Sequence, residues 1–322
     1  MAGNTSNISV LTRSKIWSTQ LKEVLKDELN AQKYVNWIDF PDGNNWTIPS
    51  IGDLDAYDYT EDTAIEYTPL DVGEFTFNIT QYKASATYIT EKARQDLFYA
   101  AQLESKFVPA EARAISVAVE TDILKQGQPG TANGQTASNA NRINNADHRW
   151  VGSDTANSNP AIGFKDFAKA RYSLTKANVG NSGLYAIVDP STAYHFNTLS
   201  GVLDITYKPR WEGIVSEGVD SGMAFKFNIF GFDIYESNYL YATTAAETIN
   251  SVTAPVGSVA NIFFSTTVDK PWIGAWRQMP KVDGEFNKDF QREEYVTTAR
   301  WGVKLYRPEN FITVLSSPNI IV

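Results

Sequence analysis

Residues 73–125 read GEFTFNITQYKASATYITEKARQDLFYAAQLESKFVPAEARAISVAVETDILK, and the order of strand and helix patterns in this stretch decides the fold. Phe75, Phe77 and Ile79 alternate with polar residues, and this two-residue period is typical of a half-buried strand. Extended character resumes and continues to Ile89, because residues that favour a pleated backbone follow one another there. The stretch therefore begins with two predicted strands.

Helical spacing replaces the two-residue period after Thr90, whose hydroxyl can cap a helix and which is followed by good helix formers. Because proline lacks a backbone N–H, Pro109 fits a first helical turn better than a helix interior. We therefore expect one helix to end before Pro109 and a second, longer helix to span about 110–125. Its apolar stripe is Ala112, Ile115, Val119 and Ile123, with Glu111, Arg113, Glu120 and Asp122 off the stripe. A helix of this length must lie against a sheet.

The composition indicates a folded protein, because 43% of the 322 residues are hydrophobic and 13% are aromatic. The absence of cysteine excludes disulfides, thiolate metal sites and a cysteine nucleophile. No apolar run suits a signal peptide or a membrane span, so we expect a soluble protein with no membrane partner. The net charge of −9 argues against binding nucleic acid by bulk charge, so any contact with DNA is expected to be loose and non-specific.

An amphipathic helix is predicted near the N-terminus, at 13–30, with Trp17 and Leu21 on its apolar face. Two covers for that face stay open: the chain's own domain, or a neighbouring subunit. The following stretch, 39–71, is rich in Gly, Pro, Asp and Tyr and buries little of itself, so we expect a projecting hairpin or arm.

Four aspartates in that arm resemble a calcium loop only loosely: Asp53, Asp55, Asp58 and Asp62. The series lacks the glycine and the final glutamate that a dedicated calcium site needs at fixed spacings. We therefore expect no metal there. A solvated acidic face, opposite basic residues of a partner, is the preferred interpretation.

The second half of the chain indicates an α/β-like core. A helix is expected at 164–177, a buried strand at 184–188 and a helix opening at Pro190. The polar stretches 126–160 and 241–258 are expected to be surface loops. Further strands are predicted at 223–229, 232–235, 261–265, 272–276, 292–305 and 311–315.

Catalytic patterns are weak in this sequence. Ser191, His195 and Asp189 could be drawn as a triad, but closeness along the chain is not triad geometry and no G-x-S-x-G elbow precedes them. No phosphate-binding or dinucleotide-binding glycine loop occurs. A glycoside hydrolase stays as the enzyme alternative, because 37 acidic residues and eight tryptophans could supply paired carboxylates and a sugar platform. We expect no enzymatic activity and no cofactor.

Taken in order, these segments resemble the major capsid proteins of tailed bacteriophages, whose shell fold is named after the Hong Kong 97 phage. The residues that carry the resemblance span most of the chain. They are YITEKARQDL at 88–97, AEARAISVAVETDILKQG at 110–127, LYAIVDPSTAYHF at 184–196, IFGFDIYESNYL at 229–240 and REEYVTTARWGVKLYRPENFITVL at 292–315. Trp301 stands where a tyrosine or similar residue is usual.

The resemblance implies an α+β fold with an N-terminal arm, an extended hairpin called the E-loop, a peripheral domain with a long spine helix, and an axial domain with a central sheet. The implied boundaries are 1–50 for the arm, 51–89 for the E-loop, 90–180 with 277–308 for the peripheral domain, and 181–276 with 309–322 for the axial domain. Candidate intersubunit contacts are Phe75, Phe77, Ile79, Trp17 and Leu21.

The resemblance also implies a function: self-assembly into the hexamers and pentamers of an icosahedral head that encloses double-stranded DNA. It implies a virion location, assembly in the bacterial host cytoplasm, and a portal as partner. Because only about fifty residues precede the arm-to-loop transition, scaffolding is expected from a separate protein. Some relatives crosslink an E-loop lysine, and Lys83 is available, but no crosslink is predicted. The rival within the same fold is an encapsulin-type shell that holds cargo enzymes.

Overall fold

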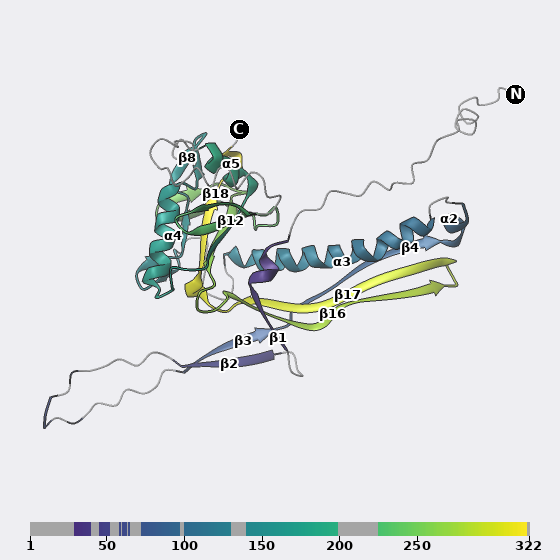
Figure 1. Cartoon of the computed structure of the whole chain (residues 1–322), viewed down its shortest axis with the longest axis horizontal. Coiled ribbons are helices and arrows are strands. Elements are labelled where there is room, and N and C mark those ends of the chain that lie inside the picture. The colour runs from purple at the N-terminus through teal and green to yellow at the C-terminus, as the bar shows by residue number, and fades with distance from the viewer. Residues whose placement is uncertain are drawn as a thin grey trace.

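The computed structural model shows two large sheets joined near the end of a long helix (Figure 1). It describes residues 29–39, 45–51, 58, 60–62, 64, 72–96, 100–129, 140–198 and 225–320. Trp17, Leu21 and most of the helix expected at 13–30 lie outside this part of the chain.

A six-stranded mixed sheet forms the more compact body, in the order β11-β12-β10-β15-β18-β7. Its central strand β15 has the sequence VANIFFS, and every residue of it is buried because both faces of the sheet are covered. The strands are β7 (Arg149–Val151), β10 (Leu184–Val188), β11 (Phe225–Ile229), β12 (Phe232–Glu236), β15 (Val259–Ser265) and β18 (Phe311–Ser316). The strands predicted at 184–188, 232–235, 261–265 and 311–315 are confirmed here, as is the described part of the strand predicted at 223–229.

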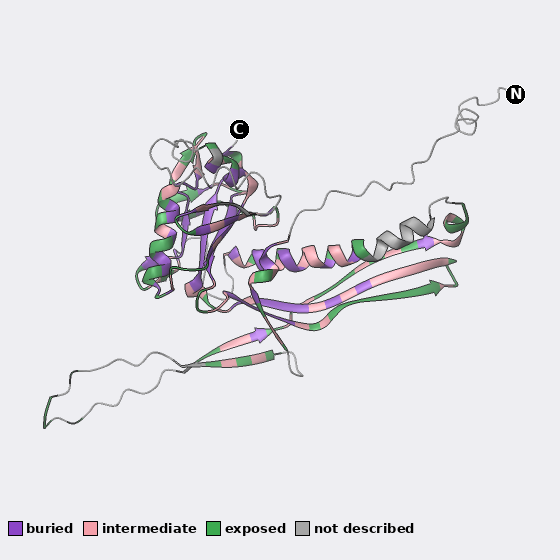
Figure 2. Cartoon of the chain, in the orientation of Figure 1, coloured by how far each residue is buried: buried purple, intermediate pink, exposed green. Residues whose placement is uncertain are grey.

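Two helices, α4 (Phe164–Lys176) and α5 (Pro190–Thr198), pack on one face of this sheet and close its main core (Figures 1 and 2). The ring of Phe167 on α4 lies at the centre. Its centroid is 5.1 Å from that of Phe196 on α5 and 5.0 Å from that of Phe263 on β15. Edge-to-face packing of this kind stabilises aromatic clusters beyond the area they bury.

The second sheet is long and four-stranded, in the order β1-β16-β17-β4. Its strands are β1 (Val35–Asp39), β4 (Gln81–Thr90), β16 (Trp272–Asn287) and β17 (Arg292–Leu305). The alternation predicted at 292–305 is confirmed as β17. β16 runs well past the predicted 272–276. Its outer part is polar and exposed, and it is held by antiparallel pairing with β17 rather than by burial (Figure 2).

Helix α3 (Ala100–Leu124) lies along one face of this sheet, with the short helix α2 (Glu91–Asp96) before it. The predicted break at Pro109 is wrong, because α3 continues through that residue and begins well before position 110. Pro109 is exposed, so water can satisfy the carbonyl that loses its donor, and the cost of an interior proline is reduced.

Strands β2 (Asn45–Ile51) and β3 (Val72–Asn78) form the base of the predicted projecting hairpin. The hairpin begins at Asn45, before the expected boundary at 51. The strand after it, β4, pairs with β17 along its whole length and therefore belongs to the four-stranded sheet rather than to the extension.

The stretches expected as surface loops contain ordered hairpins. They are β5 (Arg142–Ile143) with β6 (Ala146–Asp147), β8 (Asp154–Ala156) with β9 (Asn159–Ala161), and β13 (Glu247–Ile249) with β14 (Val252–Ala254). The residues at the three turns have positive φ: Asn144, Asn145, Asn157, Ser158, Asn250 and Ser251. Asparagine tolerates this left-handed backbone, so the Asn-rich composition that suggested loops encodes tight two-residue turns instead.

Residues 140–180 pack with the six-stranded sheet. β7 pairs with β18, and Trp150, Ile162 and Phe167 are buried against the six-stranded sheet. These few large apolar side chains decide the packing of a segment that is otherwise polar.

The central ring of the compact body supplies a stability test. Phe167→Ala should lower the free energy of unfolding by about 3–5 kcal/mol, because it removes a fully buried ring and leaves a cavity. Urea unfolding of the purified protein, followed by tryptophan fluorescence, measures the change. Tyr172→Ala, on the exposed side of the same helix, is the matched control and should change stability by less than about 0.5 kcal/mol. Equal losses in the two variants would contradict the packing described here.

Candidate assembly interface

A buried carboxylate fixes the position of residues 30–32, near the start of the described chain. Glu120 on α3 is fully buried, and its Oε1 accepts the backbone N–H groups of Asn30 at 2.9 Å and Ala31 at 2.7 Å. Its Oε2 accepts the N–H of Gln32 at 3.3 Å. Burial raises the pKa of Glu120, although these three donors act in the opposite direction. One side chain thus satisfies the donors at the start of the short helix η1 (Ala31–Tyr34).

A buried guanidinium holds the C-terminal end of α3. Arg149 on β7 donates through Nη1 to the carbonyl of Gly127 at 2.8 Å and through Nη2 to Glu247 at 2.6 Å. Both charged side chains are almost wholly removed from solvent. Because Gly127 ends η2 (Lys125–Gly127), the continuation of α3, this pair ties the helix end to the β13–β14 hairpin.

Other acidic residues of α3 face the four-stranded sheet. Thr297 donates to Glu111 at 2.6 Å, and the indole of Trp301 donates to Asp122 at 3.3 Å. The helical pattern put these acids off the apolar stripe, which predicts exposure, but Glu111 and Glu120 are buried. Only the sheet residues, which lie far away in the chain, supply the partners that make this possible.

The base of the β2–β3 hairpin is anchored on the opposite face of that sheet. Phe77 is fully buried against Ile273 and Ala275 of β16. Lys304 donates to the carbonyl of Thr76 at 2.6 Å. Gly302 is required here, since a Cβ at that position would lie 2.6 Å from the carbonyl oxygen of Asn78.

The predicted intersubunit residues therefore have different surroundings. Phe77 is enclosed within its own chain and offers no free surface, whereas Phe75 and Ile79 are only half-buried. Phe75 contacts Tyr306, with ring centroids 5.1 Å apart. Contact of Phe75 and Ile79 with a neighbouring subunit stays a prediction.

The outer half of the four-stranded sheet leaves large side chains exposed. Tyr82 is 67% exposed and Tyr88 is 56% exposed on β4. Near the tip of the β16–β17 hairpin, the guanidinium of Arg292 lies between the rings of Tyr88 and Phe290, at 4.5 and 4.7 Å from their centroids. Cation–π contacts of this kind order exposed rings without burying them. This surface, which sequence reasoning did not identify, is a second candidate contact.

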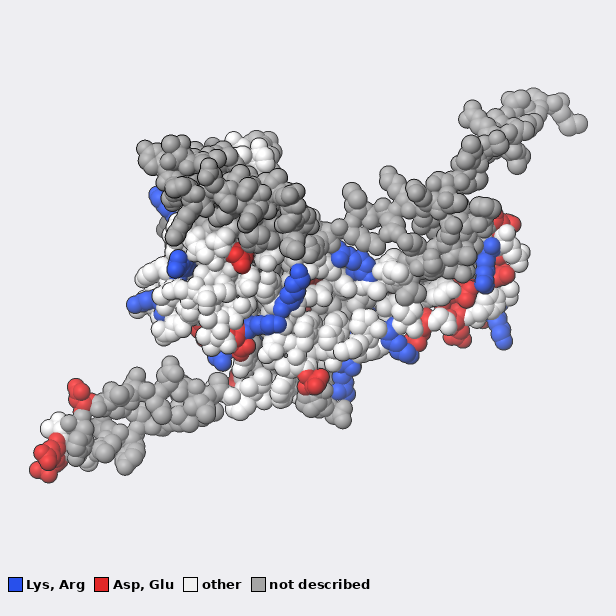
Figure 3. Space-filling model, in the orientation of Figure 1, with Lys and Arg blue, Asp and Glu red and all other residues white. Residues whose placement is uncertain are grey.

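Acidic side chains gather at two extremities of the molecule (Figure 3). One group, Asp58, Glu61 and Asp62, is exposed at the far end of the β2–β3 hairpin. The other lies along the outer part of the four-stranded sheet and includes Asp283 and Glu285. Of the four aspartates in the predicted acidic face, Asp58 and Asp62 are exposed, and Asp53 and Asp55 lie outside the described residues.

The drawn triad does not form. His195 Nε2 lies 3.3 Å from Asp154, while Ser191 hydrogen-bonds to Asp189. His195 therefore orders two surface segments of the compact body, as expected for a helix residue that packs or hydrogen-bonds. Across the described residues, no helix is long and apolar enough to cross a membrane.

Comparisons with known proteins agree with this geometry. No known protein-family profile and no curated protein sequence matches the chain. The capsid structure of cyanophage P-SCSP1u matches with a TM-score of 0.71 and 15% identity, covering 94% of this chain and 92% of that one. A chain of Mycobacterium phage Che8 matches with a TM-score of 0.65 and 17% identity, over 94% and 97%. The cyanophage Pam1 capsid matches with a TM-score of 0.63 and 13% identity, over 96% and 97%. The chain therefore has the α+β fold of phage capsid subunits, the Hong Kong 97-type fold, as the resemblance implied.

Removing the charge of Glu120 tests the arm anchor. Glu120→Gln keeps the side-chain volume but puts an amide donor among backbone donors, so it should lower the free energy of unfolding by about 1–3 kcal/mol. Urea unfolding measures this loss. Lys125→Gln, exposed near the same helix end, is the control and should change stability by less than about 0.5 kcal/mol. A Glu120→Gln protein as stable as the control would rule out this anchor.

A buried histidine predicts a pH dependence. Burial lowers the pKa of His148, and it outweighs the backbone carbonyls and carboxylates of neighbouring residues, which act in the opposite direction. The unfolded chain then takes up a proton first, so stability should fall as the pH drops below about 6.5, the unfolded value. His148→Gln should flatten this part of the curve in denaturant titrations at successive pH values. An unchanged slope would assign the dependence to other groups.

Proposed function

We propose that this chain is the major capsid protein of a tailed bacteriophage, a structural subunit rather than an enzyme. The observation that carries the proposal is the likeness to a capsid subunit over 94% of this chain and 92% of the other. Many copies would join as hexamers and pentamers of an icosahedral shell, located in the virion and assembled in the cytoplasm of the bacterial host.

The physical form of the chain supports the same proposal. The β2–β3 hairpin is anchored at its base, while its far end carries exposed carboxylates. Extensions of this kind gain stability when a second copy covers them, and closed symmetry lets one type of contact repeat around a shell. In this proposal the hairpin is the E-loop, α3 with the four-stranded sheet is the peripheral domain, and the six-stranded sheet with residues 140–198 is the axial domain.

The expected partners follow from this role. A separate scaffolding protein and a portal would act during assembly, and double-stranded DNA would be packaged by loose contact, since a net charge of −9 does not favour tight binding of phosphates. The second candidate is an encapsulin-type shell with protein cargo. The Gly-, Asn- and Ser-rich stretches favour the phage, and the contents of the particles would distinguish the two.

Expression of the chain, with negative-stain microscopy and sedimentation, tests assembly. Shells, sheets or rings of capsomers are expected, and a monodisperse monomer or dimer at high concentration would overturn the proposal. A shortened variant sharpens the test. Because Ile51 pairs with Val72, residues 52–71 can be replaced by an Asn-Gly turn that closes the hairpin. This variant should keep the circular dichroism and urea midpoint of the wild type but lose assembly. Normal shells from it would show that the hairpin end is dispensable.

A further inference from the structure

The two large sheets are both completed by one late stretch of the sequence. β17 lies between β16 and β4, and β18 lies between β15 and β7, so each is an inner strand of its sheet (Figure 1). In the sequence, both follow every other strand of the two sheets. A chain that has formed only the earlier strands therefore leaves β4 and β7 without the strands with which they pair.

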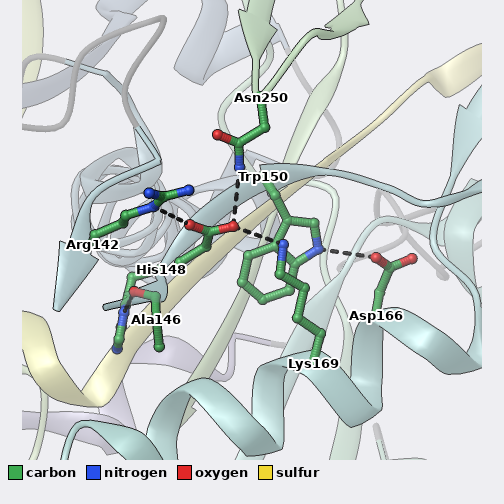
Figure 4. A network of polar contacts seen from close by, with 8 residues as sticks. Arg142, Ala146, His148, Trp150, Asp166, Lys169 and Asn250 are labelled. Carbon is green, nitrogen blue, oxygen red and sulfur yellow. Dashed lines mark hydrogen bonds and ion pairs between the residues drawn. The ribbon is translucent and has the colours of Figure 1, made fainter. Parts of the chain in front are cut away.

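Earlier segments already hold β7 against the compact body. The indole N–H of Trp150 on β7 donates to Asp166 on α4 at 3.0 Å (Figure 4). Just before β7, Asp147 accepts from Arg142 at 2.8 Å and from Lys169 at 3.0 Å. All these residues precede β17 and β18 in the sequence, so β7 is positioned by contacts that do not need the two late strands.

The edge strand of the long sheet, β4, is held in a similar way by α3. The side chain of Gln81 donates to Asp122 on α3 at 3.3 Å, and the two elements pack together. In the finished sheet, β4 pairs with β17 at every position from Gln81 to Thr90. Because backbone N–H and C=O groups in a sheet need partners, the insertion of β17 is the step that joins β4 to the rest of the sheet.

The connection between β17 and β18 is short and fixed. The N–H groups of Tyr306 and Arg307 donate to the carbonyl of Pro271, at 2.8 and 3.1 Å. Asn310 is buried, and its side-chain amide donates to the carbonyl of Asp269 at 2.8 Å. Pro271 and Asp269 belong to the earlier connection, which joins β15 to β16. The two connections between the sheets are thus bonded to each other, and this sets the position of β17 relative to β18.

Placing one of the two late strands therefore places the other. Only residues 306–310 separate them, and a short, bonded connection leaves little loop-closure entropy to lose. The ring of Phe311, the first residue of β18, lies 5.7 Å from that of Trp272, the first residue of β16. Both rings are fully buried in the core between the two sheets, together with Leu305 at the end of β17. The strand that completes one sheet is thus packed on a residue of the other.

We propose that residues 292–316 form a closing strap, which inserts after the other strands and completes both sheets in one step. The long sheet, with its exposed Tyr82 and Tyr88, is then finished only when the compact body is finished as well. A partly folded chain does not present the completed outer sheet to other chains. The inference goes beyond the proposed shell function, because it concerns a single chain and holds at concentrations at which no particle forms.

Pulsed hydrogen exchange during refolding of the full chain, read by mass spectrometry, tests the strap. Unfolding in urea is kept short so that the prolyl bonds retain their native isomers, and refolding starts at a protein concentration too low for assembly. Peptides that contain β4 and β7 should become protected with the same rate constant, within about two-fold, because one step completes both sheets. Both should follow the pairing of β10 with β12, which contains no strap residue.

Two results would overturn the strap. One is a difference between the rate constants of β4 and β7 larger than about two-fold, which would mean that the sheets close separately. The other is protection of the β10–β12 pair no earlier than that of β4, which would mean that the strap is not the last part to insert. Microscopy of the wild-type chain at high concentration tests the shell function separately, so either proposal can fail without the other.

A substitution in the crossover tests whether the strap carries the coupling. Asn310→Ala removes the bond to Asp269 and should slow the protection of β4 and of β7 by the same factor, about five-fold. Asn228→Ala, the matched control, removes a side-chain amide bond to Asp233 on the edge strand β11 and should slow neither by more than about two-fold. Slowing of one sheet alone, or of neither, would refute the strap. Should Asn310→Ala fail to refold, the wild-type comparison still decides, because it needs no substitution.

Discussion

The last two turns of α3 determine how the parts of this chain are placed. Ile123 and Leu124 are buried between the two sheets, and Glu120 and Arg149 bring charged groups into the same region. Burying a charge is costly unless it is paired and hydrogen-bonded, so each group tolerates few arrangements of its partners. Glu120 fixes the entry of the arm, and Arg149 fixes the helix end to the compact body. One joint therefore sets the relative position of the arm, the helix and both sheets.

The joint at the end of α3 holds the four-stranded sheet in place, although the outer half of that sheet is largely uncovered. The inner part of β16 is buried, but its outer part is exposed on both sides of the strand (Figure 2). Such an edge invites wrong pairing with other chains. Pro280 lacks the donor that a new strand would need, and the register shifts between Gln278 and Lys281 interrupt the ladder. The exposed edge is thus protected against indefinite sheet growth, while the side chains on its face stay available for specific contacts.

Sequence reasoning was successful where one local pattern governs the structure. The alternation of β17 and the continuous apolar run of β10 predicted both strands, because packing follows directly from those patterns. It was wrong where contacts with residues far away in the sequence determine the local structure. Helix α3 continues through Pro109 because the helix is supported by its packing on the sheet. The Asn-rich turns form hairpins in a segment whose Trp150 is buried in the same core as residues of β18. The buried role of Glu120 could not be predicted, since its partners lie about ninety residues away in the chain.

The distribution of charge bears on how the segment between β2 and β3 avoids pairing with its own copies. Its base is held by the burial of Phe77 and by the hydrogen bond from Lys304, both within the chain, so the extension starts from a fixed point. The described residues of its end include the exposed carboxylates of Asp58, Glu61 and Asp62, so the ends of two chains repel each other at low salt (Figure 3). This repulsion disfavours direct pairing of two such ends, so the same charges that keep the extension solvated also limit the contacts that it can make.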